Sequence, residues 1–215
     1  AMRRVKATRM QQSKQTVPHF YLRVDCAVDA ALDLLATAKR RRPEAVPTLT
    51  DFVIRAAAHA LRLVPGANAA WADGVVRMYD SVDVALAVNT PTGLIAPVIR
   101  QADRKELEEI AAETRTLAAG AREGTLLPAD YAGGTFTISN LGMYGVESLY
   151  AIVNPPQSCV LGIGAALSRP VAFGQEVRVA RMMACTLSAD HRVIDGALGA
   201  ELLAAIKDYI ERAGS

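Results

Sequence analysis

Apolar residues recur at helical spacing in several parts of the chain, and the clearest stripe begins just after residue 50. Side chains repeating every three or four positions are typical of a helix with one buried face. Thr48 precedes this stripe and Asp51 stands three positions later, a pairing that caps a helix start. The stripe consists of Phe52, Val53, Ala56, Ala57, Ala60, Leu61 and Val64. Similar patterns predict helices over residues 5–13, 30–41, 106–121 and 197–212.

Between these helices, apolar runs alternate with polar positions as half-buried strands do. The turn Thr90-Pro91-Thr92-Gly93 predicts a hairpin between two of them. The strands expected are residues 20–24, 82–88, 94–99, 135–139, 160–165, 177–181 and 182–188. No repeat or flexible linker divides the sequence. The pattern therefore predicts one α/β domain over residues 1–215, a two-layer sandwich of a mixed sheet covered by helices.

Composition narrows the class of protein. Of the 215 residues 51% are hydrophobic, yet no apolar run approaches the roughly 18–20 residues that a membrane span needs. The formal net charge is +2, and without a long basic face this argues against nucleic acid as the main partner. We therefore expect neither membrane nor nucleic acid as partners. We expect no signal peptide at the start. The Ala- and Arg-rich composition favours the bacterial cytoplasm over the mitochondrial matrix.

The cysteines and glycines predict no cofactor site of their own. Cys26, Cys159 and Cys185 lie far apart in apolar stretches, and no CxxC pair occurs. They are interpreted as reduced core thiols, so we expect no disulfide framework and no metal. Gly162-Ile163-Gly164 is too short, and too deep in a predicted strand, for a nucleotide loop.

His191 lies in a turn between a predicted strand and a predicted helix, four residues before Asp195. An imidazole with a pKa near roughly 6.5 can accept a proton from a thiol or hydroxyl at neutral pH. One interpretation is therefore a general base. The other is structural, with Asp195 capping the following helix and His191 hydrogen-bonded at the surface. A second histidine, His59, lies in the helix capped by Thr48 and is interpreted as structural.

Ser139 ends a predicted strand just before a glycine-rich turn that contains Gly142 and Gly145. A hydroxyl at such a place can donate a hydrogen bond to a developing oxyanion, because the glycines allow another group to approach closely. The alternative is a serine and asparagine turn that bonds only its own backbone. Spacing alone leaves both interpretations open.

The chain resembles the catalytic cores of the acyltransferases of 2-oxo acid dehydrogenase complexes over nearly its whole length. Within that family it is most similar to the acetyl-transferring branch, the dihydrolipoamide acetyltransferases of pyruvate dehydrogenase, because of the turn that follows Ser139. The segments that carry the resemblance occur in the family's order and spacing. They are residues 13–22 (SKQTVPHFYL), 84–88 (VALAV), 91–95 (PTGLI), 133–142 (GGTFTISNLG), 152–157 (IVNPPQ) and 187–196 (LSADHRVIDG).

The resemblance implies a chloramphenicol-acetyltransferase-like fold and a homotrimer with its active site in a channel between subunits. Coenzyme A would enter from one side, and a lipoyl group supplied by another domain or chain from the other. His191 would deprotonate the attacking thiol, and Ser139 of the adjacent subunit would stabilise the oxyanion. Asp195 would fix the geometry of the His191 turn through an ion pair. The other subunits of a 2-oxo acid dehydrogenase complex would be partners.

Two departures from the family pattern affect this interpretation, and a third has no assigned consequence. The sequence ends Tyr209-Ile210-Glu211-Arg212-Ala213-Gly214-Ser215, without the apolar plug that joins trimers into larger cores, so we expect a discrete trimer. Lipoyl and peripheral-subunit-binding domains are absent. Ala96 stands where threonine is expected, with no consequence assigned.

Two other functions compete with acetyl transfer between dihydrolipoamide and coenzyme A. One is a free-standing acetyltransferase of the same fold that acts on a hydroxyl, as the chloramphenicol enzymes do. The other is a structural core homologue that recruits subunits without catalysis. The match over the whole chain disfavours the first, and the presence of His191, Ser139 and Asp195 disfavours the second, so the resemblance favours the dihydrolipoyllysine-residue acetyltransferase.

Overall fold

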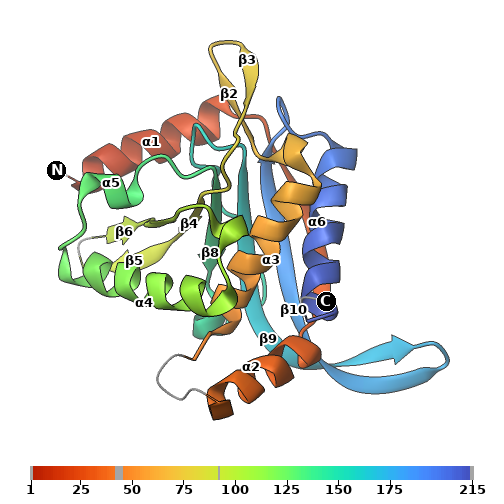
Figure 1. The fold of residues 1–215 in the computed structure, drawn as a ribbon. Coiled ribbons are helices and arrows are strands. Elements are labelled where there is room, and N and C mark those ends of the chain that lie inside the picture. Colours follow the sequence, from red (N-terminus) through yellow and green to blue (C-terminus); the bar gives the residue numbers. More distant parts are fainter. Residues whose placement is uncertain (1, 42–45, 92, 214–215) are drawn as a thin grey trace.

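A six-stranded mixed sheet forms the centre of the molecule (Figure 1). The structure, a computed structural model, describes residues 2–41, 46–91 and 93–213. In spatial order the strands are β1 (His19–Ala27), β10 (Glu176–Asp190), β9 (Cys159–Phe173), β8 (Phe136–Asn140), β4 (Val84–Leu86) and β7 (Val98–Ile99). Neighbouring strands are antiparallel except for β4 with β8 and β8 with β9, which are parallel.

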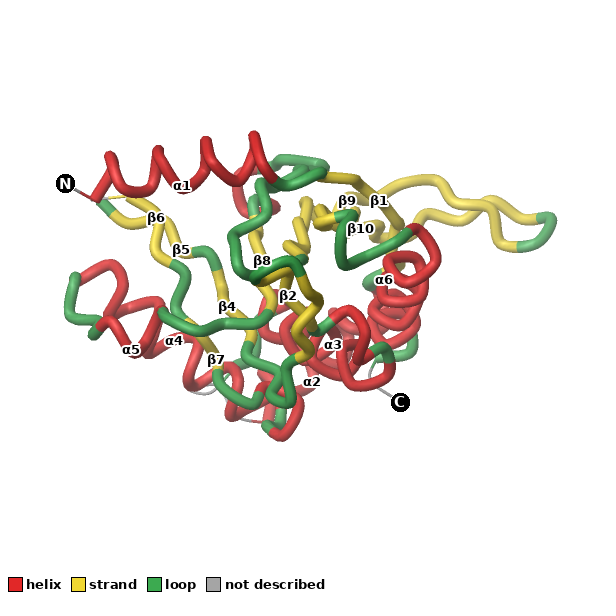
Figure 2. The backbone as a smooth tube through the Cα atoms, turned by 90° about the horizontal axis from the view of Figure 1, so that it is seen from above, coloured by secondary structure: helices red, strands yellow, loops and turns green. Residues whose placement is uncertain are grey.

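One face of this sheet is covered by helices, seen below the strands in Figure 2. They are α2 (Asp29–Arg41), α3 (Leu49–Leu63), α4 (Leu107–Glu123) and α6 (Gly196–Glu211). The Asp51 amide donates to the Thr48 hydroxyl at 3.3 Å, and the Asp51 carboxylate accepts from the Thr48 amide at 2.7 Å. This capping box begins α3, whose apolar stripe then packs into the core, with Phe52 only 2% exposed.

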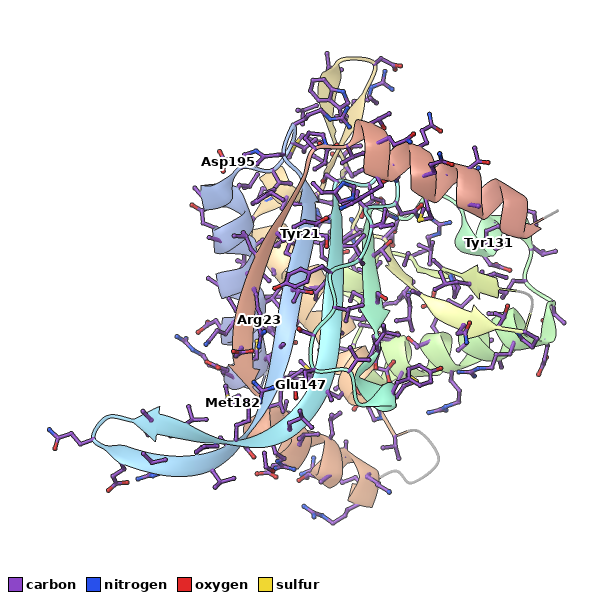
Figure 3. All side chains as sticks on the ribbon, turned by 180° about the vertical axis from the view of Figure 1, so that it is seen from behind. Tyr21, Arg23, Tyr131, Glu147, Met182 and Asp195 are labelled. Atoms are coloured by element: carbon purple, nitrogen blue, oxygen red, sulfur yellow. The ribbon has the colours of Figure 1, made fainter. Side chains whose placement is uncertain are left out.

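The opposite face of the sheet is covered only in part (Figure 3). Helix α1 (Met2–Thr16) crosses one end of it, and the segment of residues 141–158 runs over β9. The far ends of β9 and β10 continue as a two-stranded ribbon that projects from the body (Figures 1 and 3). We call the partly uncovered side the open face. No helix of the described ranges is long and apolar enough to cross a membrane.

The predicted hairpin around residues 90–93 is confirmed, although its ladder is interrupted. β4 pairs with β7, and β5 (Val88–Thr90) pairs with β6 (Gly93–Ile95) in the same register. The break falls at Pro97, which accepts from the Leu86 amide but has no amide hydrogen to donate in return. The amide of Ala87 donates to the carbonyl of Ile138 on β8. Thr92 lies outside the described residues.

The predicted α/β sandwich and its long helices are confirmed, with α1 extending beyond residues 5–13. Two strands predicted over 177–181 and 182–188 are wrong as separate elements, because both belong to β10. The sequence also missed the hairpin of β2 (Ala69–Ala72) and β3 (Val75–Met78) and the short helix α5 (Pro128–Tyr131). These elements are only four residues long, too short for a clear periodicity.

Candidate functional site

His191 follows the last residue of β10 and lies in a turn held by its two neighbours. Asp190 is buried, and its carboxylate accepts from the Arg192 guanidinium at 2.9 and 2.7 Å. This contact raises the pKa of Arg192 above its ordinary value. The guanidinium also lies 5.3 Å from the ring of Trp71 on β2. A charged pair and a cation–π contact therefore fix the turn on both sides of His191.

The backbone and ring of His191 contact the start of β1. Its amide donates to the carbonyl of Pro18 at 3.0 Å, and its imidazole centre lies 4.4 Å from the ring of Phe20. The His191 side chain is otherwise exposed. The turn thus presents an oriented imidazole to an approaching molecule, which is what a general base requires.

Asp195 caps α6, as the structural interpretation of this residue expected. Its carboxylate accepts from the amide of Leu198 at 2.8 Å (Figure 3). Within the described residues the structure gives Asp195 no ion pair, and the charged pair of this turn joins Asp190 and Arg192 instead. Asp195 therefore orients the turn by fixing the first residues of α6.

Ser139 projects from β8 toward the open face. Phe136 and Ile138 point into the helix-covered core, where both are fully buried, so alternation places Thr137 and Ser139 on the other side. There Ser139 lines a cavity of about 520 Å³ whose walls are mostly apolar. The lining includes Met10, Leu94, Ile95, Ile152 and Val160.

Two glycines on β9 let the segment of residues 141–158, part of which lines the cavity, lie close against the sheet. A β-carbon on Gly164 would lie 2.0 Å from the carbonyl oxygen of Glu147, and one on Gly162 would lie 2.6 Å from that of Leu149. The segment of residues 141–158 can cross the sheet at this distance only because both side chains are missing. The Gly162-Ile163-Gly164 sequence is therefore a crossing point of two chain segments.

Ser139 and His191 do not meet within one chain. Ser139 stands opposite Gly162 on β9, and Gly162 stands opposite Thr186 on β10. His191 is five residues further along the direction of β10 and two strands away from β8. At about 3.3 Å per residue and 4.8 Å per strand, the two positions are roughly 19 Å apart. Within one chain the two side chains are therefore too far apart to contact the same reacting atoms.

The cysteines and His59 add no reactive group to this site. The three cysteines are free and buried, and burial raises the pKa of Cys159 to about 12. Among the described residues no group of three histidine, cysteine or acidic side chains could hold a metal ion. His59 is exposed and lies against Tyr209, 5.0 Å between ring centres, far along the sequence from either half of the site.

Comparison with known proteins gives a consistent result. The family described as 2-oxoacid dehydrogenases acyltransferase (catalytic domain) matches residues 1–215. A Rickettsia bellii protein named dihydrolipoyllysine-residue acetyltransferase component of pyruvate dehydrogenase complex is 46% identical over 213 residues, which are 98% of this chain and 51% of that protein. The chain thus spans about half the length of the curated relatives it matches.

Two solved structures resemble the fold. Azotobacter vinelandii dihydrolipoamide acetyltransferase superposes with a TM-score of 0.94 at 31% identity, covering 98% of this chain and 88% of that one. That structure was determined to study one serine, one histidine and one asparagine in the catalytic mechanism. A chloramphenicol acetyltransferase superposes with a TM-score of 0.59 at 15% identity, covering 94% of each chain, so it shares the fold alone.

Proposed function

Because this chain belongs to the family of 2-oxoacid dehydrogenase acyltransferase catalytic domains, we propose that it transfers an acetyl group from S-acetyldihydrolipoamide to coenzyme A. The observation that carries the proposal is the presentation of two complementary groups, the exposed imidazole of His191 and the Ser139 hydroxyl at an apolar cavity. A base and an oxyanion donor are what transfer between thiols needs.

The spacing of these residues supports the same roles. In the Azotobacter vinelandii enzyme the serine precedes the histidine by 52 positions, and the asparagine follows the histidine by four. Ser139, His191 and Asp195 have the same two separations. The aspartate here stands in place of the asparagine, and both side chains have an oxygen that can cap a helix.

The proposed reaction needs no covalent acyl-enzyme. His191 takes the proton of the coenzyme A thiol, and the thiolate forms a bond to the thioester carbon. Ser139 donates a hydrogen bond to the resulting oxyanion. When the intermediate collapses, the bond to the dihydrolipoyl sulfur breaks, and that sulfur takes the proton back from the His191 imidazolium. One thiol and one thioester are consumed and one thiol and one thioester are formed, so atoms and charge balance.

We further propose that the working unit is a homotrimer, with Ser139 and His191 contributed by neighbouring chains. Large apolar side chains are exposed on the segment that crosses the open face and on the adjacent edge strand, and such patches mark interaction surfaces. They are Tyr21, Met143, Tyr144, Tyr150 and Ile152. Closed rotational symmetry completes every shared site equally.

In the proposed trimer, the two substrates would enter the active-site channel between subunits as separate molecules. The apolar cavity beside Ser139 fits an aliphatic arm, which both the pantetheine of coenzyme A and a lipoyl group possess. The lipoyl group would be supplied by another domain or chain of a pyruvate dehydrogenase complex in the bacterial cytoplasm.

A steady-state assay of dihydrolipoamide with acetyl-, succinyl- and isobutyryl-coenzyme A tests the proposal. Acetyl transfer should have the highest kcat/KM. A chain that transfers acetyl groups only to a hydroxyl such as that of chloramphenicol would instead be an O-acetyltransferase. Folded protein without transfer to any acceptor would identify a structural core homologue.

A further inference from the structure

Pro18 and the first two residues of β1, His19 and Phe20, connect His191 to the segment that walls the Ser139 cavity. The Pro18 carbonyl accepts from the His191 amide at 3.0 Å, and the Phe20 ring lies 4.4 Å from the His191 ring. His19 stands between them and reaches the segment that walls the Ser139 cavity. The proposed mechanism assigns no role to the imidazole of His19.

Both peptide groups of Val153 are bonded to side chains from distant elements. Its amide donates to Nε2 of His19 at 3.0 Å, and its carbonyl accepts from the hydroxyl of Ser13 on α1 at 2.5 Å. Val153 and Ser13 are almost fully buried, and His19 is half-buried. A buried backbone group that loses its partner is costly, so these two bonds hold Val153 firmly.

The partners of the His19 ring determine where its proton lies. Nδ1 is 2.9 Å from the carbonyl of Val17, which can only accept, so Nδ1 carries the hydrogen. Nε2 receives the amide of Val153, so Nε2 carries none. His19 is therefore held as one neutral tautomer, in which each ring nitrogen has one fixed partner.

We call the two hydrogen bonds that His19 and Ser13 make with Val153 the clamp. The residues on either side of Val153 connect it to the proposed site. Ile152 and Asn154, on either side of it, line the cavity that contains Ser139, together with Ala151. We propose that His19 is a positioning residue of acetyl transfer: with Ser13 it clamps Val153, so that Ile152 and Asn154 form the substrate-binding wall beside Ser139. This inference rests on the proposed function, because the wall is assigned to a substrate of that reaction.

Replacing His19 by Phe keeps a ring but removes both hydrogen bonds. In the purified full chain, His19→Phe should raise the KM of whichever thiol substrate fills the cavity, dihydrolipoamide or coenzyme A, by about 10-fold. The kcat should change less than about 3-fold, because the substitution leaves the β8 strand that carries Ser139 and the turn that carries His191 unchanged. His19→Gln keeps an acceptor for the Val153 amide and should restore most of the affinity.

Two further measurements separate positioning from a general loss of folding. Hydrogen exchange of the Val153 amide should be faster in His19→Phe than in His19→Gln, whether or not the chain is active. His59→Phe is the matched control, since His59 is exposed on α3 away from the cavity, and it should leave both KM values unchanged. If His19→Phe does not fold, Ser13→Ala removes the other clamp bond and should shift the same KM.

The outcomes distinguish this inference from the proposed function. If the unmodified chain transfers no acetyl group, the function is wrong, and Val153 exchange still tests the clamp. If the unmodified chain is active and no clamp variant changes either KM, the wall is not positioned by His19 and the inference is overturned. Equal loss of kcat in His19→Phe and His19→Gln, with KM unchanged, would also overturn it.

Discussion

Ser139 and His191 occupy very different surroundings, although the proposal gives them one reaction. His191 is exposed on a rigid turn, whereas Ser139 lies at an apolar cavity where a hydrogen bond to an oxyanion is stronger than in water. Ser139→Ala should therefore lower kcat by about 100- to 1,000-fold, with little change in KM. Ser168→Ala, on the projecting ribbon, is the control. A Ser139→Ala enzyme with more than half of normal kcat would exclude the oxyanion role.

The cysteines provide a second test at the scale of single residues. Burial raises the pKa of Cys159 to about 12, and a hydrogen bond with Cys26 together with burial raises that of Cys185, so these thiols stay protonated at pH 8. Alkylation requires the thiolate. We expect iodoacetamide at pH 8 to leave both thiols of the native chain unmodified, and to modify them after unfolding in urea. Mass spectrometry of the two samples gives the answer, and rapid labelling of native Cys159 would contradict the packing around β9.

At the scale of elements, the close crossing of residues 141–158 over β9 depends on glycine. Gly164→Ala would place a β-carbon 2.0 Å from the Glu147 carbonyl oxygen, and such overpacking costs about 1–3 kcal/mol. The matched control is Gly196→Ala at the start of α6, where an added β-carbon meets nothing within 4 Å. Thermal unfolding should separate the two: a lower Tm for Gly164→Ala and an unchanged or higher one for Gly196→Ala. Equal Tm values would mean that the crossing is looser than described.

The same elements indicate what the sequence could predict. The α3 cap and stripe are local patterns, as are the turn before α6 and the alternation of β8 that carries Ser139, and each was recognisable. The contact of Pro18 with His191 joins residues far apart in sequence, and nothing local signals it. The same is true of Val153 with His19 and Ser13. Candidate residues could be picked out from local motifs, while the contacts that support those residues required the fold.

At the scale of the whole molecule, the proposed site requires that Ser139 and His191 come from different chains. The strand register puts Ser139 and His191 roughly 19 Å apart within one chain. His191→Ala should lower kcat by roughly 100- to 10,000-fold, the range for a lost general base. Circular dichroism should show an intact fold, because the exposed imidazole contributes little to the core.

Mixing the two inactive variants tests this shared site most directly. Ser139→Ala and His191→Ala chains, unfolded together and refolded, should form mixed trimers in which some interfaces pair an intact Ser139 with an intact His191. For random mixing, about a quarter of the interfaces would be intact, so recovered kcat should reach about one quarter of normal. Each variant refolded alone is the control and should stay inactive. Mixed trimers verified by mass spectrometry that recover no activity would contradict a site shared between chains.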